Sequence, residues 1–398
     1  MSSKQDKSAT KVINAGRAKQ WTGSAVNPPV VRASTIIFDS VAQMQQASTK
    51  RADAAPFYGR RGTSTHFAFQ AAITELQGGA GTALYPSGAA AISGALLSFL
   101  RAGDHLLMVD SVYEPTRELC DTLLQGFGID TSYYDPLIGE NITSLIRPNT
   151  RVIFMESPGS ITMEVQDVPA LCRAAKAHNI MTMLDNTWAT PLLCDPFSMG
   201  IDIVIHAATK YIAGHSDVML GTATASAAYW RQLQQHSYLL GQCTSPDDIY
   251  LASRGLRTLS VRLKQHQHNA ATVAAWLATR PEVDHIRHPA FDTCPGNACF
   301  QRDFNGSNGL FSVVLKHGSR TAINAMLDSL QHFKMGFSWG GYESLILAVN
   351  NIDRIRTATQ WDKSKPLLRL HIGLEDPEDL IADLSHGFAQ FHAHQASI

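Results

Sequence analysis

Lys210 is the residue of this chain best placed to do covalent chemistry. It lies between two apolar runs, 202–205 and 218–220, and follows the small polar stretch 206–209. A lysine between buried strands is energetically costly unless it is neutralised, paired or used covalently, and its amine forms imines with carbonyl compounds. Because most lysines lie in exposed loops, this interpretation depends on the residues that accompany Lys210 upstream.

Two further residues follow apolar runs in the same way. Asp185 ends the run 180–184, and Tyr113 comes shortly after the run 106–109. A carboxylate beside a nitrogen heterocycle keeps the ring nitrogen protonated, and a tyrosine ring can stack on a flat cofactor. An acid, an aromatic and an imine-forming lysine thus follow three separate strands.

The stretch 85–89 supplies a fourth feature, a cup for phosphate. Ser87, Gly88 and Ala89 open a predicted helix, and the N–H groups at a helix start attract a dianionic phosphate. The stretch matches neither G-x-x-x-x-G-K-[ST] nor G-x-G-x-x-G, although two glycines occur in 79–81. Phosphate cup, stacking aromatic, acidic partner and imine lysine together predict pyridoxal 5′-phosphate as the cofactor.

Short apolar runs alternating with helical patterns must position these residues. Strands are predicted at 82–85, 106–109, 129–134, 151–155, 180–184, 202–205 and 218–220, and helices at 67–76, 89–100, 114–125 and 168–178, the last with Asp167 as its N-cap. This alternation favours an α/β fold with a mostly parallel sheet. In such sheets ligands bind beyond the carboxyl ends of the strands, which is where all four features fall.

The alternation weakens beyond residue 226. Helices are predicted at about 228–239 and 247–263, and strands at 283–287, 309–316 and 366–373. We therefore predict an N-terminal arm at 1–62 that completes a neighbouring subunit's site, a large cofactor-binding domain at 63–257 and a small domain at 258–398.

Composition excludes several other classes of protein. The 398 residues are 44% apolar with a net charge of −1, which gives no basis for nucleic-acid binding or a polybasic membrane contact. The start of the chain lacks a secretion signal, and no apolar run approaches membrane-spanning length. Six scattered cysteines without a C-x-x-C pair favour a reduced, cytoplasmic protein with no metal site. His266 and His268 would point apart on one helix, so both are predicted to lie on the surface.

Seven stretches spread along almost the whole chain carry a resemblance: FYGRRGTSTHF, ESPGSITMEVQDVPA, DNTWATP, HAATKYIAGHSDVMLGTA, SRGLRTLSVRL, SWGGYESLIL and LLRLHIGLEDPEDLIADL. Through them the chain resembles the cysteine/methionine-metabolism family of pyridoxal-phosphate enzymes, most closely its bacterial β-lyase branch. The resemblance implies an aspartate-aminotransferase-like (fold type I) enzyme, with a mostly parallel sheet in the large domain and a smaller α+β C-terminal domain. It also implies a homotetramer.

The resemblance assigns a role to each candidate residue. Lys210 would bind the cofactor covalently, Asp185 would pair with the pyridinium nitrogen, and Tyr113 would stack on the ring. Ser87, Gly88, Ala89 and Thr209 would hold the phosphate, with Tyr58 and Arg60 reaching in from the adjacent subunit. Arg369 would bind the substrate α-carboxylate, helped by Ser338, Trp339 and Tyr58. Either Lys210 or Tyr113 would be the base at Cα, and the sequence does not separate them.

The activity implied is β-elimination of L-cystathionine to homocysteine, pyruvate and ammonia, a step of methionine biosynthesis. The bulky Trp339 favours this over cystathionine γ-lyase or γ-synthase chemistry, while a broader cysteine or cystine desulfhydrase stays open. Ala207 and Ser160 stand where many members of the family have serine and asparagine, and β-lyases resemble this chain at both places. A silent cofactor-binding protein would not need the intact set Lys210, Asp185, Tyr113 and Arg369. A dinucleotide-dependent oxidoreductase lacks its motif here, and an interaction scaffold would predict a repeat or a charge run.

Overall fold

The computed structural model describes residues 6–352 and 355–395. Their contacts group the chain into two units, each made from two separated stretches. The first unit contains Met1–Ala102 and Met181–Ser260, and the second contains Gly103–Ile180 and Val261–Ile398. The predicted division into arm, large domain and small domain stays a prediction.

The first unit is built on four buried strands in the order β1-β7-β6-β5. These are β1 (Gly81–Tyr85), β5 (Met181–Asp185), β6 (Ile203–Ala207) and β7 (Gly221–Ala225). Strands β5 and β6 are parallel, while β7 runs antiparallel to both β6 and β1. Its main helices are α4 (Ser64–Gln77), α5 (Gly88–Phe99), α8 (Thr190–Leu193), α9 (Pro196–Met199) and α10 (Trp230–Leu239). Nearly every strand residue is buried, as expected for strands covered on both faces.

The strand predicted at 218–220 is wrong, because the strand β7 begins only at Gly221. Thr209 explains this: its hydroxyl and its backbone N–H both bind the backbone of Leu220, which ties 218–220 into the loop after Lys210. Small residues then suit β7, since a Cβ on Gly221 would lie 2.1 Å from the carbonyl oxygen of Ser87.

The described residues before α4 form short helices joined by irregular chain. These are α1 (Ser8–Asn14), α2 (Lys19–Thr22), α3 (Val41–Thr49) and the 3₁₀ turn η1 (Gly59–Arg61). Arg257, on α11 (Pro246–Ala278), donates to the carbonyls of Val12 and Ala15 at 2.7 and 2.9 Å. Helix α3, in contrast, has no buried residue.

The second unit contains three parallel strands and a separate antiparallel sheet. Strand β2 (His105–Val109) pairs in parallel with β3 (Asp130–Tyr134) and β4 (Thr150–Glu156). The associated helices are α6 (Glu114–Leu119), which continues as the π-helical η2 (Cys120–Leu124), then η3 (Gly139–Leu145) and α7 (Val168–Ala177). Asp167 caps α7 as predicted, since its carboxylate accepts from the N–H of Ala170 at 3.1 Å.

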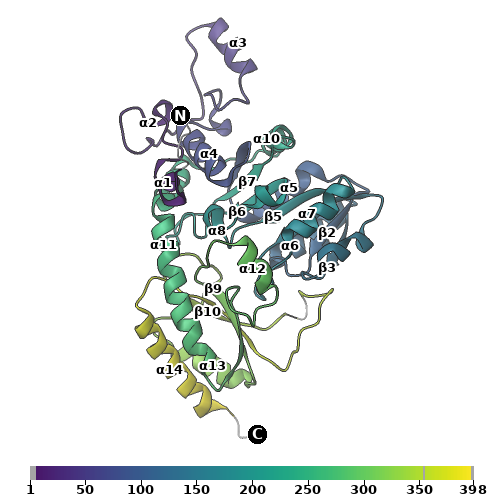
Figure 1. Ribbon diagram of the computed structural model, residues 1–398. Helices are drawn as coiled ribbons and strands as arrows, with labels where there is room; N and C mark the ends of the chain where they lie inside the picture. Colours follow the sequence, from purple (N-terminus) through teal and green to yellow (C-terminus); the bar gives the residue numbers. More distant parts are fainter. Residues whose placement is uncertain (1–5, 353–354, 396–398) are drawn as a thin grey trace. The chain divides into compact units, whose positions relative to one another are not determined.

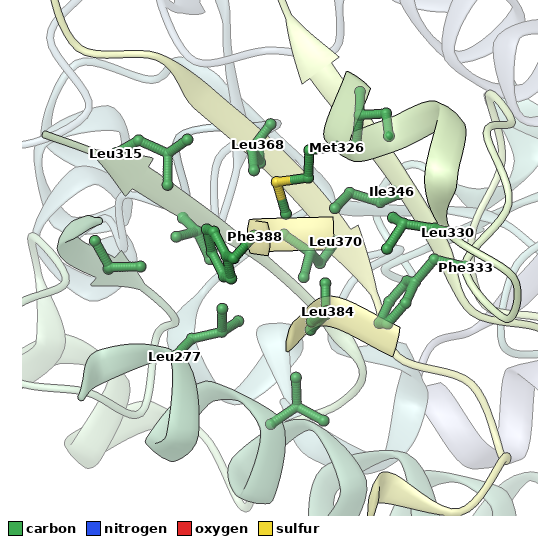
Figure 2. Close-up of a cluster of buried hydrophobic side chains, with 14 of the residues drawn as sticks. Leu277, Leu315, Met326, Leu330, Phe333, Ile346, Leu368, Leu370, Leu384 and Phe388 are labelled. Atoms are coloured by element: carbon green, nitrogen blue, oxygen red, sulfur yellow. The ribbon is translucent and has the colours of Figure 1, made fainter. Parts of the chain in front are cut away.

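The antiparallel sheet has the strand order β10-β11-β9-β8. Its strands are β8 (Val283–Arg287), β9 (Leu310–Leu315), β10 (Leu345–Val349) and β11 (Leu367–His371), and α12 (Asn297–Asp303), α13 (Arg320–Ser329) and α14 (Pro377–His394) complete the unit. Figure 1 shows α13 and α14 side by side. Figure 2 shows the core that this sheet shares with the helices, with Leu368 and Leu370 of β11 facing Met326 and Leu384.

His266 corrects one expectation, because its side chain is fully buried and not on the surface. Its Nδ1 donates to the carbonyl of Ile372 at 2.8 Å, and burial lowers its pKa to about 4. His268 is exposed as predicted. Within residues 6–352 and 355–395, no group of side chains is arranged to hold a metal ion, and no helix is long and apolar enough to cross a membrane.

Candidate active site

Lys210 lies on the tight loop that follows β6. Three residues of that strand, Ile203 to Ile205, are fully buried, so the strand fixes where the loop begins. The N–H of Lys210 donates to the carbonyl of Ala207 at 3.0 Å, and its own carbonyl accepts from Gly214 at 2.8 Å. These bonds hold the backbone on both sides of the amine, and the lysine itself is only half-buried.

Asp185 ends β5, the strand parallel to β6, and is paired in register with Ile205. Its Oδ1 accepts from both the N–H and the hydroxyl of Thr187, whose oxygen in turn accepts from the N–H of Ala207 at 2.8 Å. Burial raises the pKa of Asp185, against the opposing effects of the Thr187 hydrogen bonds and the charge of Lys210. No described residue donates to Oδ2. A buried carboxylate with one open oxygen suits a cationic N–H donor.

Helix α5 presents its first N–H groups beside the same strand ends. Ser87 caps the helix by accepting from Ala90 at 3.1 Å, whereas the N–H groups of Gly88 and Ala89 meet no acceptor among the described residues. A Cβ on Gly88 would lie 2.5 Å from the Cβ of Ala207, so only glycine lets the helix approach the β6 turn this closely. Free N–H groups at a helix start form an anion site.

Together these groups fit pyridoxal 5′-phosphate. The described part of the first unit provides two N–H donors for the phosphate, an open carboxylate oxygen for the ring nitrogen and an amine on the loop after the neighbouring strand for the aldehyde. Asp185, Lys210 and the Ser87–Ala89 turn are therefore brought together as the sequence predicted, although their ligand roles stay predictions.

Of three other predicted cofactor ligands, Thr209 and Arg60 bond to the protein itself, and Tyr58 is exposed. The hydroxyl of Thr209 donates to the carbonyl of Leu220 at 3.2 Å and accepts from its N–H at 2.9 Å, so it closes the lysine loop. Tyr58 is 45% exposed, and Arg60 donates to the carbonyl of Tyr238 at 2.8 Å. The proposed contact of Tyr58 and Arg60 with an adjacent subunit stays a prediction.

Arg369 is the main cation of the candidate site in the second unit. It projects from β11, and its Nη2 donates to the carbonyls of Gly336 and Ser338 at 3.2 and 3.3 Å. Burial lowers the pKa of Arg369, while the nearby Tyr113 opposes this shift. No carboxylate among residues 6–352 and 355–395 pairs with this guanidinium. Arginine stays charged and a buried charge needs a partner, so this environment is compatible with the predicted carboxylate-binding role of Arg369, which stays a prediction.

Tyr113 and the Ser338–Trp339 segment belong to the same unit. Tyr113 is 46% exposed, and its backbone N–H donates to the carboxylate of Glu156, at the end of β4, at 2.8 Å. The Ser338 carbonyl is held by Arg369, and Trp339 is half-buried beside it in sequence. The second unit thus groups Tyr113, Arg369 and Ser338.

Sequence reasoning missed three residues that support these groups. Thr187 orients Asp185, Glu156 holds the Tyr113 turn, and His371 contacts the turn after Trp339. Glu156 and Thr187 had a signal, since each polar side chain ends or closely follows an apolar strand. His371 had no such signal, because a histidine in an apolar strand is equally compatible with a purely structural position in the core.

Comparison with solved structures identifies the class of fold. The structure matches that of a cystathionine γ-lyase from Lactobacillus plantarum complexed with L-serine, with a TM-score of 0.89 at 29% identity over 97% of this chain and 100% of that one. The chain accordingly has the fold-type-I architecture, with a mostly parallel sheet and a separate antiparallel sheet.

The family follows from comparison of sequences. The model of the Cys/Met metabolism PLP-dependent enzymes matches residues 9–389, and this chain belongs to that family. A cystathionine β-lyase of Escherichia coli strain K12 is 50% identical over 386 residues, covering 96% of this chain and 98% of that protein. A cystathionine β-lyase of Haemophilus influenzae is 48% identical over 393 residues, covering 98% and 99%. The cofactor of this chain is pyridoxal 5′-phosphate.

Proposed function

We propose that this enzyme is a carbon–sulfur lyase that cleaves L-cystathionine and water into homocysteine, pyruvate and ammonia, as a step of methionine biosynthesis. The observation that carries the proposal is the near-50% identity, over almost the whole chain, with proteins named cystathionine β-lyases. The γ-lyase of similar structure is only 29% identical. The groups around Asp185 in the first unit and around Arg369 in the second unit are of the chemical kinds that the reaction needs.

Substrate binding starts from the carboxylate. The Arg369 guanidinium, held by two carbonyls and without a carboxylate partner among the described residues, binds the α-carboxylate of cystathionine as a charge-assisted pair. Ser338 and Trp339 border this position. Fixing the carboxylate orients the Cα–H bond for removal of its proton.

Proton transfer is the work of the lysine and tyrosine. When bound, pyridoxal phosphate withdraws electrons from the substrate Cα. Asp185 would keep the ring nitrogen protonated through its open Oδ2, and the Gly88 and Ala89 N–H groups would hold the phosphate. With the cofactor bound, the Lys210 amine would take the Cα proton and give a proton to the leaving sulfur. Tyr113 is the competing candidate for the base.

Departure of the sulfur at Cβ yields homocysteine and a three-carbon enamine. Hydrolysis of that enamine gives pyruvate and ammonia, which balances the one water consumed. A γ-lyase would instead release 2-oxobutyrate and cysteine from the same substrate. Product analysis of cystathionine incubated with the purified enzyme therefore decides between them, and Lys210→Ala serves as the matched inactive control. Cystine as a second substrate tests for a broader desulfhydrase.

We also propose that the enzyme works as a cytoplasmic homotetramer in which the arm at 1–62 reaches a neighbouring subunit. Support comes from exposed apolar groups in the arm, since Ile37 is 86% exposed, Val41 is 65% exposed and α3 buries none of its residues. The exposed Tyr58 and Arg60 at the end of the arm would then contribute to the partner's phosphate and substrate site. The six free cysteines are consistent with a reducing compartment.

A further inference from the structure

Strand β11 holds the segment 336–344, which we call the Trp339 loop, through side chains on one face. Leu368 and Leu370 point into the core (Figure 2), so Arg369 and His371 point to the opposite face. Arg369 binds the carbonyls of Gly336 and Ser338. The carboxylate-binding residue and the next polar side chain of the strand therefore face the same loop.

His371 contacts the turn directly after Trp339. Its Nε2 lies 3.1 Å from the nitrogen of Gly340 and 3.1 Å from the oxygen of Gly341, and the residue is 1% exposed. An unprotonated Nε2 accepts from Gly340, and a protonated Nε2 donates to Gly341, so either tautomer ties the turn to the strand. Gly340 has φ +86°, a conformation that favours glycine.

A second layer anchors the strand end that carries His371. From α11, His266 donates to the carbonyl of Ile372, and Asn269 donates to the carbonyl of Glu375 at 2.8 Å. The rings of His266 and His371 lie 5.2 Å apart. Since burial lowers the pKa of His266 to about 4, it is a neutral, fixed support near pH 7.

The far end of the Trp339 loop is anchored separately. The N–H and hydroxyl of Ser344 both donate to the carboxylate of Glu375 at 2.8 Å, and Leu374 donates to the carbonyl of Tyr342 at 2.8 Å. Between Arg369 at the start of the loop and Glu375 at its end, His371 contacts the Gly340–Gly341 turn.

We propose that His371 is a positioning residue for the lyase reaction, which fixes Ser338 and Trp339 beside Arg369 by holding the Gly340–Gly341 turn. The inference rests on the proposed function for its effect on catalysis, but its effect on the loop is independent of any activity. A misplacement of about 1 Å at a site of this kind can lower a rate by about 100-fold.

Three variants separate the hydrogen bond from packing. His371→Leu removes the polar atom, and His371→Gln places an amide near the position of Nε2. His288→Leu is the matched control, because His288 is equally buried in the same unit and packs against Phe291 and Phe311. Its Nδ1 accepts from the N–H of Ala290, outside the Trp339 loop.

Hydrogen exchange of the holoenzyme measures the loop directly. We expect peptides covering 336–344 to exchange about tenfold faster in His371→Leu, to regain most of their protection in His371→Gln, and to be unchanged in His288→Leu. Equal exchange in His371→Leu and the wild type would overturn the proposal. So would equal acceleration in His288→Leu, since that result indicates general loosening of the unit.

Kinetics on cystathionine then tests the consequence for catalysis. We expect kcat/KM to fall about 10- to 100-fold in His371→Leu, to recover to within about threefold in His371→Gln, and to stay within about twofold in His288→Leu. A wild-type enzyme that forms no pyruvate refutes the proposed function, and the exchange result still decides the role of His371. If the wild type is active and His371→Leu has an unchanged kcat/KM, the positioning role of His371 is refuted and the proposed function stands.

Discussion

Asp185→Asn should lower activity without lowering the stability of the cofactor-free protein. An asparagine Oδ1 can accept both Thr187 hydrogen bonds that the aspartate accepts, so the local geometry is kept. What the substitution removes is the charge that Oδ2 offers to the protonated ring nitrogen. The change therefore isolates the electrostatic role of the carboxylate.

The size of the effect follows from the burial of Asp185, which is only 8% exposed. Removing one partner of a buried ion pair costs about 3–5 kcal/mol. Since each 1.36 kcal/mol changes a rate about tenfold, kcat/KM for cystathionine should fall by about 10²- to 10⁴-fold.

The stability of the apoprotein should move in the other direction. Burial raises the pKa of Asp185, so its favourable contribution to folding is present below the unfolded pKa and is lost as the pH rises through the folded pKa. At pH 7 the ionised carboxylate therefore lowers the free energy of unfolding of the cofactor-free protein. We expect apo Asp185→Asn to melt at the same temperature as the wild type or higher.

Pyruvate formation and thermal melting of the apo and holo forms test both parts. Asp202→Asn is the matched control, because Asp202 accepts the same pair of bonds from Thr182 and burial also raises its pKa, but it lies at the opposite end of β6 from Lys210. The reasoning fails if Asp185→Asn keeps kcat/KM within about tenfold of the wild type, or if its apo form melts well below the wild type.

Three other predictions follow from the same contacts. Arg369→Ala should raise KM for cystathionine about 10- to 100-fold, since a hydrogen bond to a charged group contributes about 1.5–3 kcal/mol; an unchanged KM would exclude the carboxylate role. Burial lowers the pKa of His266 and of His288 to about 4, so between about pH 6.5 and 4 each histidine binds a proton when the protein unfolds. The free energy of unfolding should therefore fall by about 1.4 kcal/mol per pH unit for each histidine as the pH drops through that range. Urea melts across this range check it, and a flat profile would contradict it. Mixing and reassembling inactive Lys210→Ala and Arg60→Ala subunits should restore up to about a quarter of wild-type activity if Arg60 serves a neighbouring site; no recovery would place Arg60 in its own subunit's site or outside the site.

The sequence predicts where Asp185 and Lys210 lie in the fold for a physical reason, while their ligand roles stay predictions. A parallel strand that is buried on both faces appears as a continuous apolar run, and the first polar residue after it marks the ligand edge. Asp185 carries that signal directly, Lys210 follows the polar stretch 206–209 that carries it, and both lie at or beyond the ends of buried strands. The helix cap at Ser87 depends on local chemistry, so the sequence predicts the start of helix α5 as well.

The parts that sequence reasoning missed depend on contacts distant along the chain. Strand β7 has the sequence GTATA, which has a weak strand propensity. Gly221 is needed because the backbone of Ser87 comes too close for a side chain, and no local sequence pattern shows this. His266 and His268 do point apart on α11, but one of those two directions faces the protein interior and the carbonyl of Ile372. The position of that interior is set by the sheet, which local spacing does not reveal.

Strand β10 was overlooked although Leu345–Val349 is apolar. The strand comes directly after the segment SWGGYES, which the sequence analysis used only for its candidate substrate-binding residues. In the structure that segment and the strand are linked, because Ser344 anchors both the loop end and the start of β10 to Glu375.

The most direct test of the account is to locate the cofactor on the chain. Reducing the holoenzyme with borohydride and mapping its tryptic peptides should place the pyridoxyl group on Lys210. Because a modified lysine resists trypsin, the label should appear on one uncleaved peptide covering residues 177–231. A label on any other lysine, or full cleavage at Lys210 in an active holoenzyme, would contradict the account.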